Sequence, residues 1–272
     1  MFSHYANLLQ HDPFPTIQVA LAFASGIAYP NLDIPHEIAR IEKLTQQAYV
    51  RLPSGITRIE RAERISDFLF HEERFRGNTA NFTDPRNSFL NDVLERKLGL
   101  PITLALLYVE IAQRLGVKAH GVGLPGHFIV RVDEGEQTIF LDPFNGGGRL
   151  TRADCAQLVM QSTGFAGPLQ DNWLEPISGE ATILRMLTNL RHSFTARKEW
   201  EMLVRTLEHL QIIAPGNIRY QHDLGVALFE KGEKLAGIYQ LEAYLLKEKR
   251  PKAAKAAQIR LNQMVERVAR LN

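Results

Sequence analysis

The sequence is poor in the residues that mark several classes of protein. It holds a single cysteine, Cys155, among 272 residues, so no disulfide can form within the chain and a reducing compartment is indicated. The 32 lysines and arginines nearly balance the 30 aspartates and glutamates, which argues against nucleic acid or an anionic membrane as the main partner.

Long apolar segments are also missing. The longest apolar run, residues 17–30, is too short and too interrupted to span a bilayer. Residues 1–15 lack the basic segment and apolar core of a secretory signal. We therefore expect a cytoplasmic protein with no nucleic-acid partner and no membrane partner.

Helical periodicity dominates both ends of the chain. Apolar residues recur at helical spacing over 15–28, 36–50 and 57–75. From residue 181 onward the pattern is again all-helical, and it repeats after 34 residues. The matching pairs are Leu190 with Leu224, Phe194 with Leu228, and Leu207 with Leu241. This spacing resembles that of tetratricopeptide repeats, in which each unit is a pair of helices.

The middle of the chain mixes helices with strands. A short helix over 88–97 precedes a strongly apolar helix from Pro101 to Leu115. The second helix is expected to begin at Pro101, because proline suits the first turn of a helix. Three apolar runs separated by glycine-rich or acidic turns predict short strands over 118–124, 127–132 and 138–143. A helix capped by Thr151 follows.

These patterns predict an α+β fold in three parts. The first is a helical N-terminal region over 1–80 that packs on the core. The second is a mixed core over 81–170, and the third is an all-α set of tetratricopeptide-like repeats over 181–272.

Two polar residues stand at the ends of neighbouring predicted strands. His127 begins one strand directly after Pro125-Gly126, and Asp142 ends the next. Such a pair supplies two members of a nucleophilic triad, in which the acid orients the imidazole and the imidazole takes the proton of the nucleophile. The nucleophile is missing, since Cys155 follows both residues and is better explained as a buried residue of an apolar helix face.

The order of a buried helix, a strand histidine and a strand-end aspartate resembles the core of the transglutaminase-like (papain-related) superfamily. In that superfamily the helix begins with the nucleophilic cysteine and closes on an Arg-x-Leu-Gly-like turn, which Arg114-Leu115-Gly116 match here. Counting back from this turn, Pro101 takes the place of the cysteine. The resemblance implies the fold of the superfamily with its thiol chemistry lost.

A denser resemblance covers residues 78–152. The stretches 84–116, 121–132 and 142–151 are similar to bacterial Sir-B-type regulators, which combine a transglutaminase-like core with a tetratricopeptide-like C-terminal region. That branch has Gly-x-Pro-Ile-Ser/Thr at the head of the helix, as residues 99–103 do here. The resemblance implies the fold and supplies no reaction or ligand.

Thr103 is the hydroxyl nearest to the former cysteine position. With His127 and Asp142 it would make an acyl-transfer enzyme, whereas hydrogen bonding at the helix end is its structural alternative. His127 and Asp142 could equally bind a carboxylate or an amide, or serve as a polar pair that joins two strands. One histidine and one aspartate do not predict a metal site, and no cofactor is expected.

A second group of candidates lies in the loop before the 88–97 helix. Arg86 could reach an anionic ligand, or pair with Asp92 or Glu95. Asn87 is expected to cap the helix. The predicted binding residues are therefore Arg86, Asn87, Pro101 and His127.

We expect a non-catalytic protein, possessing a degenerate site, that acts by binding a protein or peptide. The alternative is a hydrolase or acyl transferase in which Thr103 or an activated water acts with His127 and Asp142. A C-terminal face with Arg219, Tyr220, His222 and Lys231 would bind the partner, unless it packs against residues 1–80.

Overall fold

The computed structural model describes residues 2–270, and all structural statements below refer to this part of the chain. Position 1 of the predicted N-terminal region and positions 271–272 of the predicted repeats lie outside it. The α-helices are α1 (Phe2–Leu8), α2 (Thr16–Ile27), α3 (Ile34–Tyr49), α4 (Arg58–Asp67), α5 (Leu90–Arg96), α6 (Pro101–Arg114), α7 (Arg152–Thr163), α8 (Gly179–Arg197), α9 (Trp200–Ile213), α10 (Arg219–Lys231), α11 (Lys234–Lys247) and α12 (Pro251–Ala269).

Strands and short helical turns are confined to the middle of the chain. The strands are β1 (Arg76–Gly77), β2 (Leu98–Gly99), β3 (Ala119–Val122), β4 (Ile129–Glu134), β5 (Gln137–Asp142) and β6 (Gly148–Leu150). The turns are the π-helical η1 (Phe68–Glu72) and the 3₁₀ turns η2 (Pro85–Asn87), η3 (Pro143–Asn145) and η4 (Asp171–Leu174).

The predicted helices and strands are present, although one helix differs in extent and α1, β1, β2 and β6 were not predicted. The helix expected over 57–75 leaves α-helical geometry at Phe68, and Arg74 with a φ of 62° ends the helical run before β1. The strand β6 was not predicted, because its sequence is glycine-rich. Pairing with the edge of β5 imposes the extended conformation on it.

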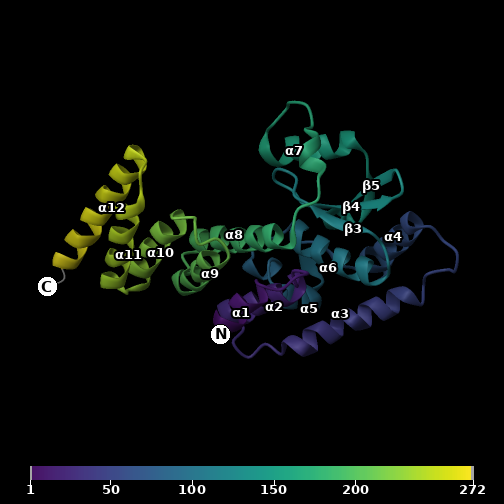
Figure 1. The fold of residues 1–272 in the computed structure, drawn as a ribbon, viewed down its shortest axis with the longest axis horizontal. Helices are drawn as coiled ribbons and strands as arrows, with labels where there is room; N and C mark the ends of the chain where they lie inside the picture. Colours follow the sequence, from purple (N-terminus) through teal and green to yellow (C-terminus); the bar gives the residue numbers. More distant parts are fainter. Residues whose placement is uncertain (1, 271–272) are drawn as a thin grey trace.

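A four-stranded antiparallel sheet, in the order β3-β4-β5-β6, forms the centre of the mixed core. Successive side chains of its strands point alternately into two hydrophobic layers. Val130, Val132 and Leu141 face the main core, in which α6 packs on β3 and β4. Ile129 and Phe140 face the other way, toward a smaller cluster that includes residues of α7. Figure 1 shows the sheet with α6 and α7 on its two sides.

The helices α8–α12 form an arm that extends away from the sheet (Figure 1). Each helix packs against the next, and α1 and α2 pack against α9 at the base of the arm. The helices α8 and α10 end at Arg197 and Lys231, 34 positions apart. Close packing of α10 on α11 depends on Gly225 and Gly237, since a Cβ on either would lie within 3 Å of the other's carbonyl oxygen. No helix within residues 2–270 has the length and apolar character needed to cross a membrane.

Candidate functional site

The antiparallel register brings His127 and Asp142 together. Val130 of β4 pairs with Leu141 of β5, so the start of β4 and the end of β5 lie side by side, with His127 in the turn just before β4. His127 Nε2 lies 3.0 Å from Oδ1 and 3.1 Å from Oδ2 of Asp142. The hydrogen bond expected from the sequence is therefore present. Because an ionised carboxylate only accepts, Nε2 carries the proton and Nδ1 is the acceptor of the neutral ring.

Asp142 accepts further hydrogen bonds from the turn that follows it. The backbone N–H groups of Phe144 and Asn145 donate to Oδ1 at 3.1 and 3.3 Å, and the Asn145 side-chain amide donates to Oδ2 at 2.7 Å. Burial alone would raise the pKa of Asp142, but the hydrogen bonds from His127 and Asn145 outweigh it and lower the pKa below its usual value. The carboxylate is thus held ionised by a set of donors that includes the imidazole.

The His127–Asp142 pair is enclosed rather than open. The side chains are 8% and 3% exposed, and the Phe144 ring packs against the imidazole in a T-shaped arrangement at a centroid distance of 5.9 Å. Phe144 itself packs directly on Gly77, where a Cβ would lie 2.5 Å from the ring. A hollow of about 360 Å³ between β6 and α7 is lined by Asp142 and not by His127. The imidazole is therefore almost fully covered by protein atoms.

The turn that carries Phe144 is anchored from the opposite side as well. Ser66 Oγ donates to the carbonyl oxygen of Gly147 at 2.7 Å. Gly147 has a φ of 75°, and a Cβ there would lie 2.1 Å from Ser66 Oγ and 2.2 Å from the Phe70 ring. Only glycine therefore allows this turn to close against α4 and η1.

The head of α6 lies next to this turn. η3 packs against α6 and against β1, and β1 pairs with β2, which leads directly into α6. Pro101 is the first residue of the helix, and the N-cap residue Leu100 makes no side-chain capping bond. Thr103 is fully buried, and its Oγ1 has no hydrogen-bond partner. The expectation that Thr103 bonds the helix end is therefore wrong, because its buried hydroxyl makes no hydrogen bond within the described residues.

Cys155 lies on α7 in the smaller hydrophobic cluster, and it is fully buried. Burial raises the pKa of its thiol to about 11. The expectation of a buried cysteine on an apolar helix face is confirmed, and the thiol has the properties of a structural residue.

Asn87 does not cap α5, whose N-cap residue is Phe89. Its side chain is fully buried, accepts from Asn78 Nδ2 at 3.0 Å and donates to the carbonyl oxygen of Asn81 at 2.8 Å. Its own carbonyl oxygen accepts from the N–H of Leu100 at 3.1 Å. The capping prediction is wrong because the 3₁₀ turn η2 shifts the start of α5, and Asn87 instead ties the entry of α6 to the preceding loop.

Arg86 pairs with Asp84 rather than with Asp92 or Glu95. The Nε and Nη2 atoms of its guanidinium lie 3.1 and 2.8 Å from Asp84 Oδ2. Burial opposes ionisation of Asp84, but the bonds from Arg86 outweigh it and lower the pKa of this carboxyl. The hydroxyl of Tyr29 donates to Asp92 instead.

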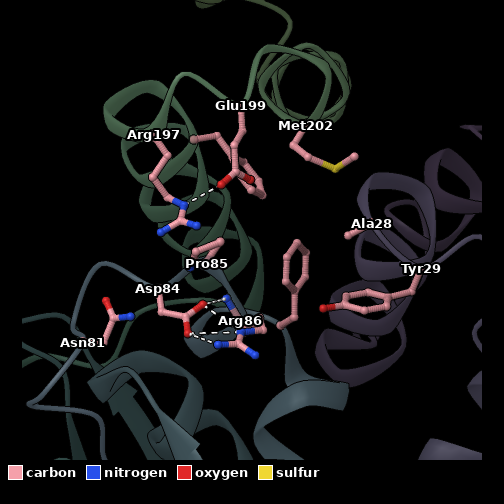
Figure 2. A pocket seen from close by; sticks show the side chains of 11 residues that line it. Ala28, Tyr29, Asn81, Asp84, Pro85, Arg86, Arg197, Glu199 and Met202 are labelled. Carbon is pink, nitrogen blue, oxygen red and sulfur yellow. Dashed lines mark hydrogen bonds and ion pairs between the residues drawn. The ribbon is translucent and has the colours of Figure 1, made fainter.

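Arg86 also lines a cavity of about 430 Å³ between the core, α2 and the base of the arm. Figure 2 shows two ion pairs on its walls, Arg86 with Asp84 and Arg197 with Glu199. Phe89, Phe194 and Met202 supply the apolar surface. The cavity has room for a small ligand, although the charged side chains that line it already form ion pairs with one another.

Arg185 is a residue near the site that the sequence did not single out. From α8 its Nη2 donates to the carbonyl oxygens of Leu124 at 2.7 Å and His127 at 2.6 Å, and the guanidinium stacks over Phe128 at 5.5 Å. Burial lowers its pKa. No local pattern could reveal this residue, because its partners lie about 60 positions earlier in the chain.

No group of three or more potential metal ligands occurs among residues 2–270. The histidine and aspartate of the site thus lack further ligands in the described part of the chain, and the arrangement offers no built metal centre.

The chain is similar to several known proteins. A profile of the transglutaminase-like superfamily matches residues 36–188. A UPF0162 protein of Xylella fastidiosa is 31% identical over 244 residues, covering 86% of this chain and 84% of that protein. F-box only protein 21 of Homo sapiens is 32% identical over 120 residues, which are 40% of this chain and 19% of that protein. A crystal structure of menin, said to reveal the binding site for Mixed Lineage Leukemia (MLL) protein, is only loosely similar, at a TM-score of 0.41 and 12% identity over 86% of this chain and 66% of that one.

Proposed function

The chain belongs to the transglutaminase-like superfamily and to the UPF0162 family, and from this premise we propose that it is a non-catalytic member that acts by binding a protein or peptide. The observation that carries the proposal is the head of α6. There Pro101 stands at the position that the superfamily resemblance gives to the nucleophile, and the nearby Thr103 hydroxyl is fully enclosed.

The remaining chemistry of the site supports the same conclusion. His127 and Asp142 are hydrogen-bonded and enclosed, so a substrate would have to displace Phe144 to reach the imidazole. The single thiol, Cys155, is buried with a raised pKa in another cluster. A satisfied, buried polar pair stabilises the sheet without any catalytic role.

The arm offers surface for a partner. Leu235, Tyr239 and Leu246 of α11 are 76%, 68% and 90% exposed, and their spacing places them on one face of the helix. Exposed apolar side chains that gather on one face are typical of protein-binding surfaces. The prediction that Tyr220 belongs to such a face is wrong, because this side chain is only 7% exposed.

The proposal also covers the repeat character of the arm, a regulatory role and the location of the protein. The 34-residue offset between the ends of α8 and α10 supports a tetratricopeptide-like arm. A regulatory role and a cytoplasmic location accord with the resemblance to Sir-B-type regulators and with the enclosed single cysteine.

Two observations favour the alternative of a hydrolase or acyl transferase. The Asp142 contact uses Nε2 and leaves Nδ1 of His127 as a base, and Thr103 Oγ1 has no partner in the structure. Opening of the Phe144 turn would be required to bring a substrate or water to the imidazole.

The full-length protein and its His127→Ala variant distinguish the two functions. We expect no hydrolysis of nitrophenyl esters or peptide amides above background. We also expect the full-length protein to capture a partner selectively after crosslinking in a lysate, with crosslinks to both the arm and the core. Ester or amide hydrolysis that disappears in the folded His127→Ala variant would overturn the proposal. The arm variant Tyr239→Ser should weaken capture of the partner and leave the background rate of ester and amide hydrolysis unchanged.

A further inference from the structure

A third hollow lies where the end of α3, α4 and the end of α6 come together. It has a volume of about 710 Å³, enough for several amino-acid residues. Its principal lining residues are Tyr49, Val50, Leu52, Arg61, Arg114 and Leu115. Two of these are arginines, and no acidic residue lines the hollow.

Arg61 has hydrogen-bonding capacity that the protein does not use. Its Nη1 donates to the carbonyl oxygen of Leu115 at 2.9 Å. Its Nε is enclosed without a hydrogen-bond partner. Within residues 2–270, Nη2 makes no hydrogen bond and the guanidinium makes no ion pair. The Nε–Nη2 edge, with which arginine binds a carboxylate through two parallel bonds, is thus left without an acceptor.

An enclosed donor without a partner is unfavourable, because it has lost its bond to water and gained none in the protein. The second arginine of the hollow does not share this property. Arg114 Nε donates to Glu110 at 2.7 Å, and its Nη1 lies 3.6 Å from Glu42. Arg61 is therefore the cation of this hollow whose Nε–Nη2 edge has no acceptor within the described part of the protein.

The rim beside Arg61 is apolar and exposed. Tyr49 and Val50, at the end of α3, are 66% and 74% exposed. Leu52 and Leu115 continue the apolar surface into the hollow. An anion with a full hydration shell, such as free phosphate, would leave this apolar surface in water, whereas a peptide would cover it.

We propose that this hollow binds a short segment of a partner protein in which an acidic side chain is flanked by large apolar residues. The carboxylate pairs with the Nε–Nη2 edge of Arg61, after a small shift of the side chains that enclose Nε. The apolar neighbours cover Tyr49 and Val50. This inference deepens the proposed binding function by naming a place and a chemistry for the partner.

The test uses the full chain and three tripeptides, followed by amide and arginine side-chain NMR signals. The probes are acetyl-Leu-Glu-Leu-amide, its neutral match acetyl-Leu-Gln-Leu-amide, and acetyl-Leu-Gln-Leu with a free C-terminal carboxylate. We expect the glutamate peptide to bind at least about fivefold more tightly than the neutral one, since a bidentate charged pair is lost in the latter. Shifted signals should come from Tyr49, Val50 and Arg61.

Arg61→Lys keeps the charge and removes the planar fork, so we expect the preference for glutamate to fall below about twofold. Arg64→Lys is the matched control on the same helix. Arg64 is exposed and lies outside the hollow, and its replacement should leave the preference intact. Val50→Ser, at a position too exposed to affect folding, should weaken both the glutamate and the glutamine peptide.

Equal affinity for the glutamate and glutamine peptides, or shifted signals that map to another surface, would overturn the inference. Stronger binding of the free C-terminus than of the glutamate side chain would overturn the choice of an internal acidic segment. Either result leaves the non-catalytic proposal standing, because that proposal depends on the assays with His127→Ala.

Discussion

The replacement Asp142→Asn tests most directly whether the His127–Asp142 pair stabilises the folded protein. The change is nearly isosteric and leaves Oδ1 able to accept from His127 Nε2 and from the backbone N–H groups of Phe144 and Asn145. The new amide, however, places a donor where Oδ2 now accepts from Asn145 Nδ2 at 2.7 Å. The variant therefore loses the negative charge and one hydrogen bond, and it sets two donors against each other.

The size of the effect follows from the burial of the pair. Loss of one charge-assisted hydrogen bond costs about 1.5–3 kcal/mol, and a buried donor left without an acceptor costs about 1–3 kcal/mol. Because most acceptors survive in asparagine, we expect the free energy of unfolding to fall by about 3 kcal/mol. For a chain of this size that corresponds to a decrease in melting temperature of about 6–12 °C.

The loss should also depend on pH. The folded-state pKa of Asp142 lies below its usual value, so its contribution is fully present above the unfolded pKa of about 3.9. It disappears as the pH falls through the lower, folded pKa. The difference between wild type and variant should therefore be constant near neutral pH and should shrink below about pH 4.

Urea unfolding followed by circular dichroism measures both quantities, provided that the slope with denaturant is unchanged. The matched control is Asp171→Asn, which removes a carboxylate that is 87% exposed and pairs with Arg152. It should change stability by less than about 0.5 kcal/mol. If Asp142→Asn is as mild as this control, or if its effect persists unchanged at pH 3, the reasoning is refuted.

Three further results are expected. Gly147→Ala should lower the free energy of unfolding by about 3 kcal/mol, because a methyl group there meets Ser66 and Phe70. Gly146→Ala, with positive φ but open space, should lower it by about 1 kcal/mol, and equal urea midpoints for the two would contradict this. With a thiol pKa raised to about 11 by burial, Cys155 should stay unmodified by a chromogenic disulfide reagent at pH 8 and react fully in guanidinium; rapid labelling of the native protein would show the burial to be wrong. Arg185→Gln should lower the free energy of unfolding by about 2 kcal/mol and shift the NMR signals of the turn before β4, since two carbonyl oxygens lose a charged donor; an unchanged urea midpoint would argue against that role.

The sequence determined by itself most of the helices and three strands of the main sheet, and it singled out the pair that joins two of those strands. Helical spacing identified α6, and short apolar runs between turn residues identified β3, β4 and β5. Those signals are local, since they depend on the period with which apolar side chains recur. The placement of His127 before β4 and of Asp142 at the end of β5 was enough to predict their hydrogen bond.

Only the tertiary structure decided the state of the groups around that pair. Whether the Thr103 hydroxyl finds a partner, whether Asn87 caps a helix and where Arg86 pairs depend on segments that meet after folding. The same holds for Arg61, whose unused edge appears only when the end of α6 occupies one terminal nitrogen. Hydrogen bonding and burial at these positions are set by distant segments of the chain, so no local pattern in the sequence encodes them.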